Sequence, residues 1–156
     1  MRRLSGMVLA GAMLMLPAFS LSGHAQEAAA QPAANKTTYN ADAVIVMYAV
    51  NPGKDADYEQ VLAKLRDALN KSTAPEAKQQ LAGWKVIKAS KPMPDGNVIY
   101  THVISPVAGA DYNILQVLYG TFTDPTEQKT LYDLYRGAFV GNLGISSGTV
   151  VADLSK

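Results

Sequence analysis

The chain contains no cysteine among its 156 residues. Disulfide scaffolds and thiol catalysis are therefore excluded, and the fold has to be held by burial of apolar side chains. Tryptophan occurs once and histidine twice. Neither sign of charge dominates, since the formal net charge is +1. This balance favours neither nucleic acid nor an anionic membrane as a partner.

Residues 1–25 have the pattern of a secretory signal peptide. Two arginines precede an uncharged apolar run over residues 4–21, and small residues allow cleavage after Ala25. A retained membrane anchor is the alternative, because the run approaches spanning length. Pro17 and the cleavage pattern favour removal. We therefore predict export to the periplasm or the extracellular space, with cleavage near Ala25 and no stable membrane insertion afterwards.

The rest of the chain divides into a tether and one domain. Residues 26–41 are rich in Ala, Gln, Asn and Thr and have no apolar period, which predicts a disordered tether. Residues 42–156 are enough for one hydrophobic core and too few for two ordinary domains. We predict a single domain over 42–156.

The first half of this domain alternates strand and helix patterns. Ala43–Val50 is a run of apolar β-formers, typical of a central strand. Apolar residues at three- and four-residue steps from Tyr58 to Leu69 predict an amphipathic helix of about four turns. A short helical turn over residues 76–80 ends at Gly83. Trp84–Ser90 and Asn97–Val107 then predict two strands joined by a tight Asp-Gly turn.

The second half contains further helix signals and one more strand. Asp111 is predicted to cap a helical region, and Asp124-Pro125-Thr126-Glu127 has the composition of a capping box that starts another helix. The glycines at 141, 144 and 148 predict an irregular loop. Thr149–Leu154 is predicted to be the last strand.

The order strand, helix, strand, strand, helix, strand predicts an α+β, ferredoxin-like βαββαβ sandwich. Its four-stranded antiparallel sheet has the order 4-1-3-2, with the helices on one face. The Val44–Val50 strand with the following Asn51-Pro52-Gly53-Lys54, and the Trp84–Val103 hairpin, resemble the dimeric α/β-barrel group of ferredoxin-like proteins. That group includes small monooxygenases, haem-degrading enzymes, stress-response barrel proteins and chlorite-dismutase relatives. The resemblance implies two sheets packed face to face, and it carries no catalytic residue onto this chain.

Alternation along the strands gives two sets of side chains, one for each sheet face. We assign the small aliphatic set to the helix-covered face: Ile45, Met47, Ala49, Ile87, Ala89, Ile99, Thr101, Val103, Val150, Ala152 and Leu154. We assign the other set to the uncovered face: Val44, Val46, Tyr48, Trp84, Val86, Lys88, Val98, Tyr100, His102, Ile104, Thr149, Val151 and Asp153.

Four residues of the second set are the candidate ligand-binding residues: Tyr48, Trp84, Tyr100 and His102. Antiparallel pairing places Tyr48 beside Tyr100 and brings Trp84 near His102 or Ile104. Each of these residues also has a purely structural interpretation. His102 would then be a hydrogen-bonded structural histidine, and the three aromatic rings would only pack against their neighbours. The charges of Lys88 and Asp153 are predicted to block strand addition at the sheet edges.

Several chemistries lack their motifs. No His/Asp/Glu cluster has metal-ligand spacing, no Gly-x-Ser-x-Gly elbow occurs, and the glycines near the C-terminus do not form a phosphate loop. We therefore predict no metal site and no cofactor, and the catalytic residues, if the chain is an enzyme, are unknown.

The leading hypothesis is an exported homodimer that pairs through the open sheet face and serves as a small-ligand-binding or structural module. The expected ligand is small and apolar or aromatic, and no nucleic-acid partner is expected. The alternative, which rests on the resemblance alone, is a cofactor-independent monooxygenase or a haem-binding or haem-degrading enzyme. Either enzyme would use His102, as base or axial ligand, and haem would be the cofactor of the haem-handling enzyme only.

Overall fold

A computed structural model of the chain describes residues 36–152 and residue 154. The predicted signal peptide, most of the predicted tether and Asp153 lie outside the described residues. The elements in order are β1 (Ala43–Val50), α1 (Asp55–Lys71), α2 (Ala77–Gly83), β2 (Trp84–Lys88), β3 (Val98–Ile104), α3 (Ile114–Thr121), α4 (Pro125–Ala138) and β4 (Phe139–Gly148).

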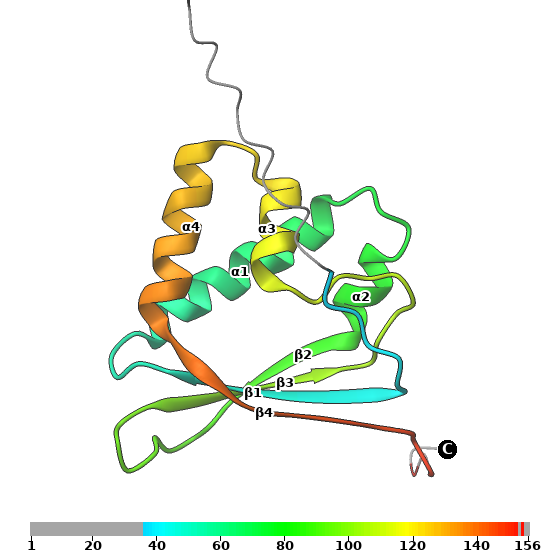
Figure 1. The fold of residues 1–156 in the computed structure, drawn as a ribbon, viewed down its shortest axis with the longest axis horizontal. Helices are drawn as coiled ribbons and strands as arrows, with labels where there is room; N and C mark the ends of the chain where they lie inside the picture. The colour runs from blue at the N-terminus through cyan, green and yellow to red at the C-terminus, as the bar shows by residue number, and fades with distance from the viewer. Residues whose placement is uncertain (1–35, 153, 155–156) are drawn as a thin grey trace, which may run out of the picture. The chain divides into compact units, whose positions relative to one another are not determined.

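The four strands form one antiparallel sheet in the order β2-β3-β1-β4, which confirms the predicted α+β class and strand order. The helices α1, α2, α3 and α4 lie on one side of this sheet, and no helix of the described residues lies on its other side (Figure 1). The β2–β3 connection contains the predicted Asp-Gly turn, where Gly96 adopts a φ of +84° that favours glycine.

The two long helices follow the predicted patterns. In α1 the buried residues repeat at three- and four-residue steps: Tyr58, Val61, Leu65, Ala68 and Leu69. In α4 the Asp124 carboxylate accepts the Glu127 backbone N–H at 2.9 Å, and Pro125 opens the first turn. This capping bond satisfies one of the otherwise free N–H groups at the helix start.

The prediction for the last strand is wrong. The segment predicted to be an irregular loop is β4, whereas the described part of Thr149–Leu154 contains no strand. β4 pairs with β1 through two register shifts, one between Met47 and Tyr48 and one between Ala49 and Val50. Such bulges add residues to one strand, so the period-two alternation that marks a strand is lost. Gly144, at φ +154°, pairs with Met47 directly beside the first of these shifts.

The core fills the layer between the helices and the sheet. Its largest cluster joins α1, α2, α3 and α4. Of two smaller clusters, one joins β1 and β3 to Ala110 and Tyr112 in the β3–α3 connection, and the other joins β1 and β3 to Tyr58 of α1 and Ala138 of α4. Thr37 and Tyr39, which fall in the predicted tether, also contact this domain. The Tyr112 N–H donates to the Thr37 carbonyl at 2.8 Å, and the Tyr39 and Tyr112 rings lie 5.4 Å apart. Among the described residues, no helix is both long enough and apolar enough to cross a bilayer.

Candidate functional site

The four candidate ligand-binding residues lie close together, as the strand register predicted. Tyr48 pairs with Tyr100 across β1 and β3, and Trp84 is the partner of Ile104 across β2 and β3. The Tyr48 and His102 ring centroids are 4.9 Å apart, and those of Trp84 and His102 are 5.8 Å apart. The three strands therefore assemble one aromatic cluster from Tyr48, Trp84, Tyr100 and His102.

The predicted face of this cluster is wrong. Its side chains point toward the helices, because Tyr58 and Glu59 of α1 bond to His102 and Tyr100 respectively. Small aliphatic residues were expected there because they allow close packing. Instead, the large rings fill the layer between sheet and helices, and α1 supplies polar partners for His102 and Tyr100. The aliphatic residues of β1, β2 and β3 consequently lie on the uncovered face, where Ile45, Met47 and Ile87 are exposed.

His102 is a buried histidine with both ring nitrogens engaged. Trp84 Nε1–H donates to His102 Nδ1 at 2.9 Å, and His102 Nε2 lies 2.9 Å from the Tyr58 hydroxyl. Because an indole nitrogen can only donate, Nδ1 is the unprotonated acceptor. The neutral ring therefore carries its hydrogen on Nε2 and donates it to Tyr58. This chain of bonds ties β2, β3 and α1 together.

Burial lowers the pKa of His102 from 6.5 to about 4. A proton added to Nδ1 would face the Trp84 N–H, so protonation also requires the indole bond to break. His102 is consequently neutral at physiological pH. Service as a base or an axial ligand would require one of its two present bonds to be given up.

Tyr48 stands at the edge of the cluster nearest β4. Its ring meets the Phe139 ring edge-on, with centroids 5.3 Å apart. Burial raises the pKa of Tyr48 above its ordinary value, so its phenol stays protonated. Tyr48 also lines a cavity of about 230 Å³ to which Tyr39, Tyr112 and Tyr135 contribute. This cavity lies on the helix side of the sheet.

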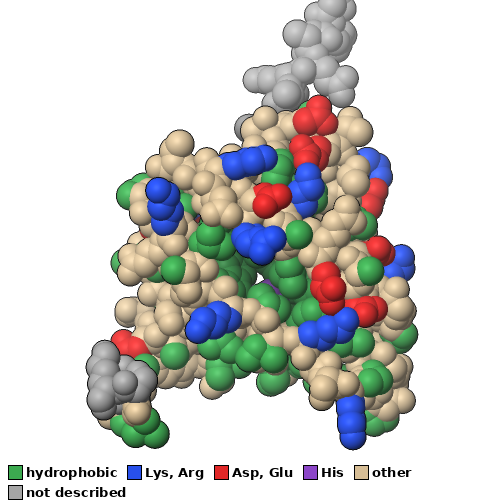
Figure 2. Space-filling view, turned by 180° about the vertical axis from the view of Figure 1, so that it is seen from behind, with side chains coloured by type: hydrophobic (Ala, Val, Ile, Leu, Met, Phe, Trp, Pro, Cys, Tyr) green, Lys and Arg blue, Asp and Glu red, His purple; other side chains and the backbone are tan. Residues whose placement is uncertain are grey.

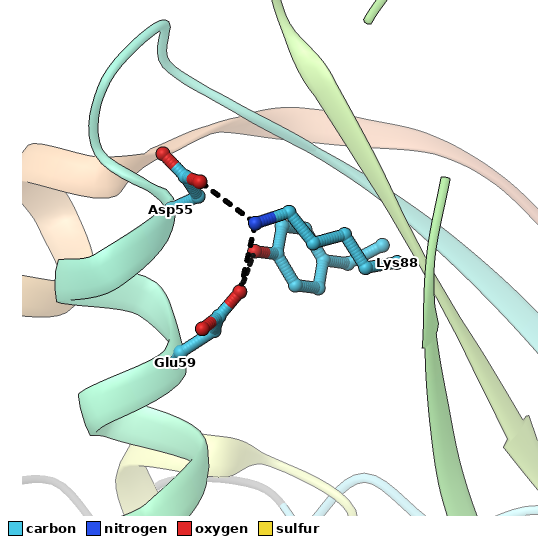
Figure 3. A network of polar contacts seen from close by, with 4 residues as sticks. Asp55, Glu59 and Lys88 are labelled. Carbon is cyan, nitrogen blue, oxygen red and sulfur yellow. Dashed lines mark hydrogen bonds and ion pairs between the residues drawn. The ribbon is translucent and has the colours of Figure 1, made fainter. Parts of the chain in front are cut away.

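A polar network connects Tyr100 to the first turns of α1. Lys88 Nζ donates to Asp55 at 2.7 Å and to Glu59 at 2.9 Å, and the Tyr100 hydroxyl donates to Glu59 at 2.8 Å. Figure 3 shows the lysine between the two carboxylates. Lys88 was expected only to protect a sheet edge, and no sequence pattern indicated these partners. Lys88 lies about thirty residues along the chain from Asp55 and Glu59, so only the fold brings the three side chains together.

The hydrogen bonds of this network shift the pKa values of its side chains. The hydrogen bond from Lys88 lowers the pKa of Asp55, and the bonds from Lys88 and Tyr100 lower the pKa of Glu59. Burial, followed by the bond to Glu59, raises the pKa of Tyr100 to about 12. The network thus holds ionised carboxylates, an ammonium and a neutral phenol, which is a structural ion cluster rather than an acid–base pair poised near neutral pH.

A cleft of about 270 Å³ lies between α1, α2 and β2. Leucines of α1 and α2 form its walls together with Trp84 and Val86 of β2. Within the described part of the chain, Arg66 is the one charged residue that lines the cleft. Trp84 is the only residue of the aromatic cluster that reaches this cleft. The sequence pattern placed Leu62 and Leu65 on the apolar stripe of the helix, but no pattern indicated that Arg66 belongs to a site.

The residues that the structure describes include no group of three His, Cys, Asp or Glu side chains that could hold a metal ion. Comparison with known proteins adds no assignment, because no family model, no curated protein and no solved structure matches this chain.

Proposed function

We propose that the protein is a self-associating module of the dimeric α/β-barrel type, in which two copies pair through the open face of the sheet. The main support for this proposal is the exposure of apolar side chains on the uncovered face of the sheet. Ile87 is 57% exposed, Ile45 42% and Met47 38%, although each belongs to a strand of a β-sheet. Ile99 and Val103 lie on the same face beside them.

A second copy is the occupant best suited to this surface. A sheet face built of β-branched and unbranched aliphatic side chains packs well against another sheet, at about 10 Å between the two. A two-fold axis would bring the same face of each copy together, so one surface serves both partners. Burying it removes an apolar patch from water, which is the main driving force of association.

The proposal is tested by the mass of the particle in solution. Light scattering or native mass spectrometry of the protein at micromolar concentration should give a dimer. Ile87→Lys places a charge on the open face and should give a monomer with unchanged helix content. Tyr132→Lys is the matched control, because Tyr132 is similarly exposed (44%) but lies on α4. A monomeric wild type, or a dimeric Ile87→Lys variant, would contradict the proposal.

The enzymatic alternative, with His102 as base or axial ligand of a haem, remains a prediction. Both nitrogens of His102 already have partners and its ring is almost fully buried, so the geometry favours a structural role for it. Adding haemin to the wild type and to His102→Ala separates the two roles. We expect no Soret shift that depends on His102, and such a shift would favour the haem-handling alternative.

The export of the protein likewise remains a proposal. It rests on the pattern of residues 1–25, which lie outside the described residues. Detection of a shortened chain that begins near Gln26 in the exported fraction would support it.

A further inference from the structure

The cleft between α1, α2 and β2 is open to solvent and apolar inside. Leu62, Leu65 and Leu69 of α1 face Val86 and Trp84 of β2 across it. Figure 2 shows the molecule from the side opposite to Figure 1, where its surface is hollowed between hydrophobic side chains and Lys or Arg side chains stand at the rim. A pocket of about 270 Å³ with apolar walls accommodates a small molecule that has an apolar body.

One wall of the cleft is held in place before any ligand arrives. The Trp84 indole N–H is bonded to His102 Nδ1 at 2.9 Å, and the Trp84 ring packs against the Tyr112 ring with centroids 5.3 Å apart. The polar atom of the indole is therefore satisfied inside the core, and its apolar surface is left to line the cleft. A wall that is already ordered reduces the entropy lost on binding.

Arg66 gives the cleft its charge. Its side chain is exposed on α1, and none of the described residues that line the cleft carries a carboxylate. The described ion pairs engage other carboxylates: Asp55 and Glu59 with Lys88, Asp57 with Lys54, Glu127 with Lys64, and Asp133 with Lys129. A guanidinium beside an apolar pocket matches a carboxylate, which it can bind through two parallel hydrogen bonds.

We infer that this cleft is a binding site for a small apolar monocarboxylate, such as a medium-chain fatty acid. The hydrocarbon body lies between the leucines of α1 and the β2 residues Trp84 and Val86, and the carboxylate meets Arg66 at the rim. The site is distinct from the surface proposed for self-association, because it lies on the helix side of the sheet. Its occupancy and the dimer can therefore be tested separately.

Trp84 provides the readout, because it is the only tryptophan in the chain. Titration of the full-length protein with octanoate should change Trp84 fluorescence saturably, since the indole forms part of the cleft. Octanol, which has the same chain length without the charge, should bind more weakly. An absence of any saturable change with octanoate, confirmed by calorimetry, would overturn the inference.

Arg66→Gln tests the charged end of the site. The side chain is exposed, so the variant should fold like the wild type. We expect its octanoate affinity to fall by about two- to fivefold, the range for a solvent-exposed ion pair, while its octanol affinity stays the same. Arg136→Gln, on the exposed surface of α4, is the matched control and should bind octanoate like the wild type. Equal octanoate affinity of the Arg66→Gln variant and the wild type would overturn the assignment of a carboxylate.

Val86→Phe tests the apolar end, because the larger ring fills the space between α1 and β2. A variant that keeps its helix content and its unfolding midpoint should lose binding of both octanoate and octanol. Leu62→Phe fills the same cleft from the α1 side and should have the same effect. Undiminished octanoate binding by either folded variant would place the ligand elsewhere and overturn the inference. Dimer mass should be unchanged in both, which separates this result from that of the open-face variants.

Discussion

The two faces of the sheet differ in a way opposite to the simplest expectation. The face under the helices carries a histidine, two tyrosines and the tryptophan, whereas the face without helices carries Ile45, Met47 and Ile87. The covered face therefore carries several large side chains with polar atoms. Yet its polar atoms are paired: the described residues include no buried side-chain nitrogen or oxygen without a hydrogen-bond partner.

The difference between the two faces shows that a polar side chain can lie on the covered face of the sheet when a hydrogen-bond partner is available there. Tyr58 of α1 places a hydroxyl over His102, and Glu59 places a carboxylate near Tyr100. A buried polar group that keeps its hydrogen bonds is tolerated, whereas one that loses them is destabilising. The aliphatic residues of the other face need only an apolar neighbour, which a second copy of the chain would supply.

Substitution of two adjacent residues of β1 tests most directly which face of the sheet the helices cover. Val46 is 1% exposed beneath the helices, whereas Met47 points to the open face. Val46→Lys would bury an unpaired ammonium and should destabilise the fold by more than about 4 kcal/mol, enough to unfold many small domains. Met47→Lys should leave the folded monomer intact. Circular dichroism with urea unfolding measures both, and a larger loss for Met47→Lys would reverse the assignment of the faces.

His102→Ala removes the centre of the bond chain between β2, β3 and α1. It leaves Trp84 Nε1 and the Tyr58 hydroxyl without their partner and opens a cavity, so we expect a loss of about 3–5 kcal/mol in the free energy of unfolding. Thr101→Ala is the control from the same strand and the opposite face, and should cost less than about 1 kcal/mol. Similar losses for the two variants would mean that the bond chain has little effect on stability.

The stability should also depend on pH through His102. Its folded pKa of about 4 lies below the ordinary 6.5, so the unfolded state takes up its proton first. This contribution is fully present above pH 6.5 and is lost as the pH falls toward 4, by about 3 kcal/mol in all. Unfolding free energies measured across this range, with the His102 ring titrated by NMR, check it. A ring that titrates near 6.5 in the folded protein would contradict it.

Tyr58→Phe removes a single hydroxyl from the same chain of bonds. His102 Nε2–H would then lack its acceptor, while the phenyl ring keeps its packing. We expect a loss of about 1–2 kcal/mol, smaller than for His102→Ala because no large cavity forms. Tyr132→Phe, which removes an exposed hydroxyl on α4, is the control and should have almost no effect. Urea unfolding curves of the two variants give the comparison.

Lys88→Met should reduce the free energy of unfolding less than Val46→Lys, His102→Ala or Tyr58→Phe. Lys88 and its partners Asp55 and Glu59 are all partly or largely exposed, and exposed ion pairs are weakened by water and salt. The measurable signature is the salt dependence of the unfolding midpoint, which the variant should reduce. An unchanged salt dependence would show that the network in Figure 3 does not contribute to stability in solution.

Local sequence patterns predicted most of the secondary structure. The stripe of α1, the cap at Asp124 and the continuous apolar run of β1 depend on residues close together in the chain, and each element lies where its pattern indicated. The pairing of Tyr48 with Tyr100 followed from strand direction and turn position. β4 was missed because two bulges interrupt its alternation, and bulges depend on the neighbouring strand rather than on β4 itself.

The order of strands and helices, and the side-chain sets of β1, β2 and β3, follow from the amino-acid sequence, because periodicity and turn chemistry are local properties. Which set the helices cover does not follow from it. Both sets are apolar enough to be buried, and the choice depends on what α1 presents to the sheet across more than forty residues of chain. Only the packed structure pairs Tyr58 with His102 and sets Arg66 beside an apolar cleft, because hydrogen bonds and cavities form between segments that no local pattern connects.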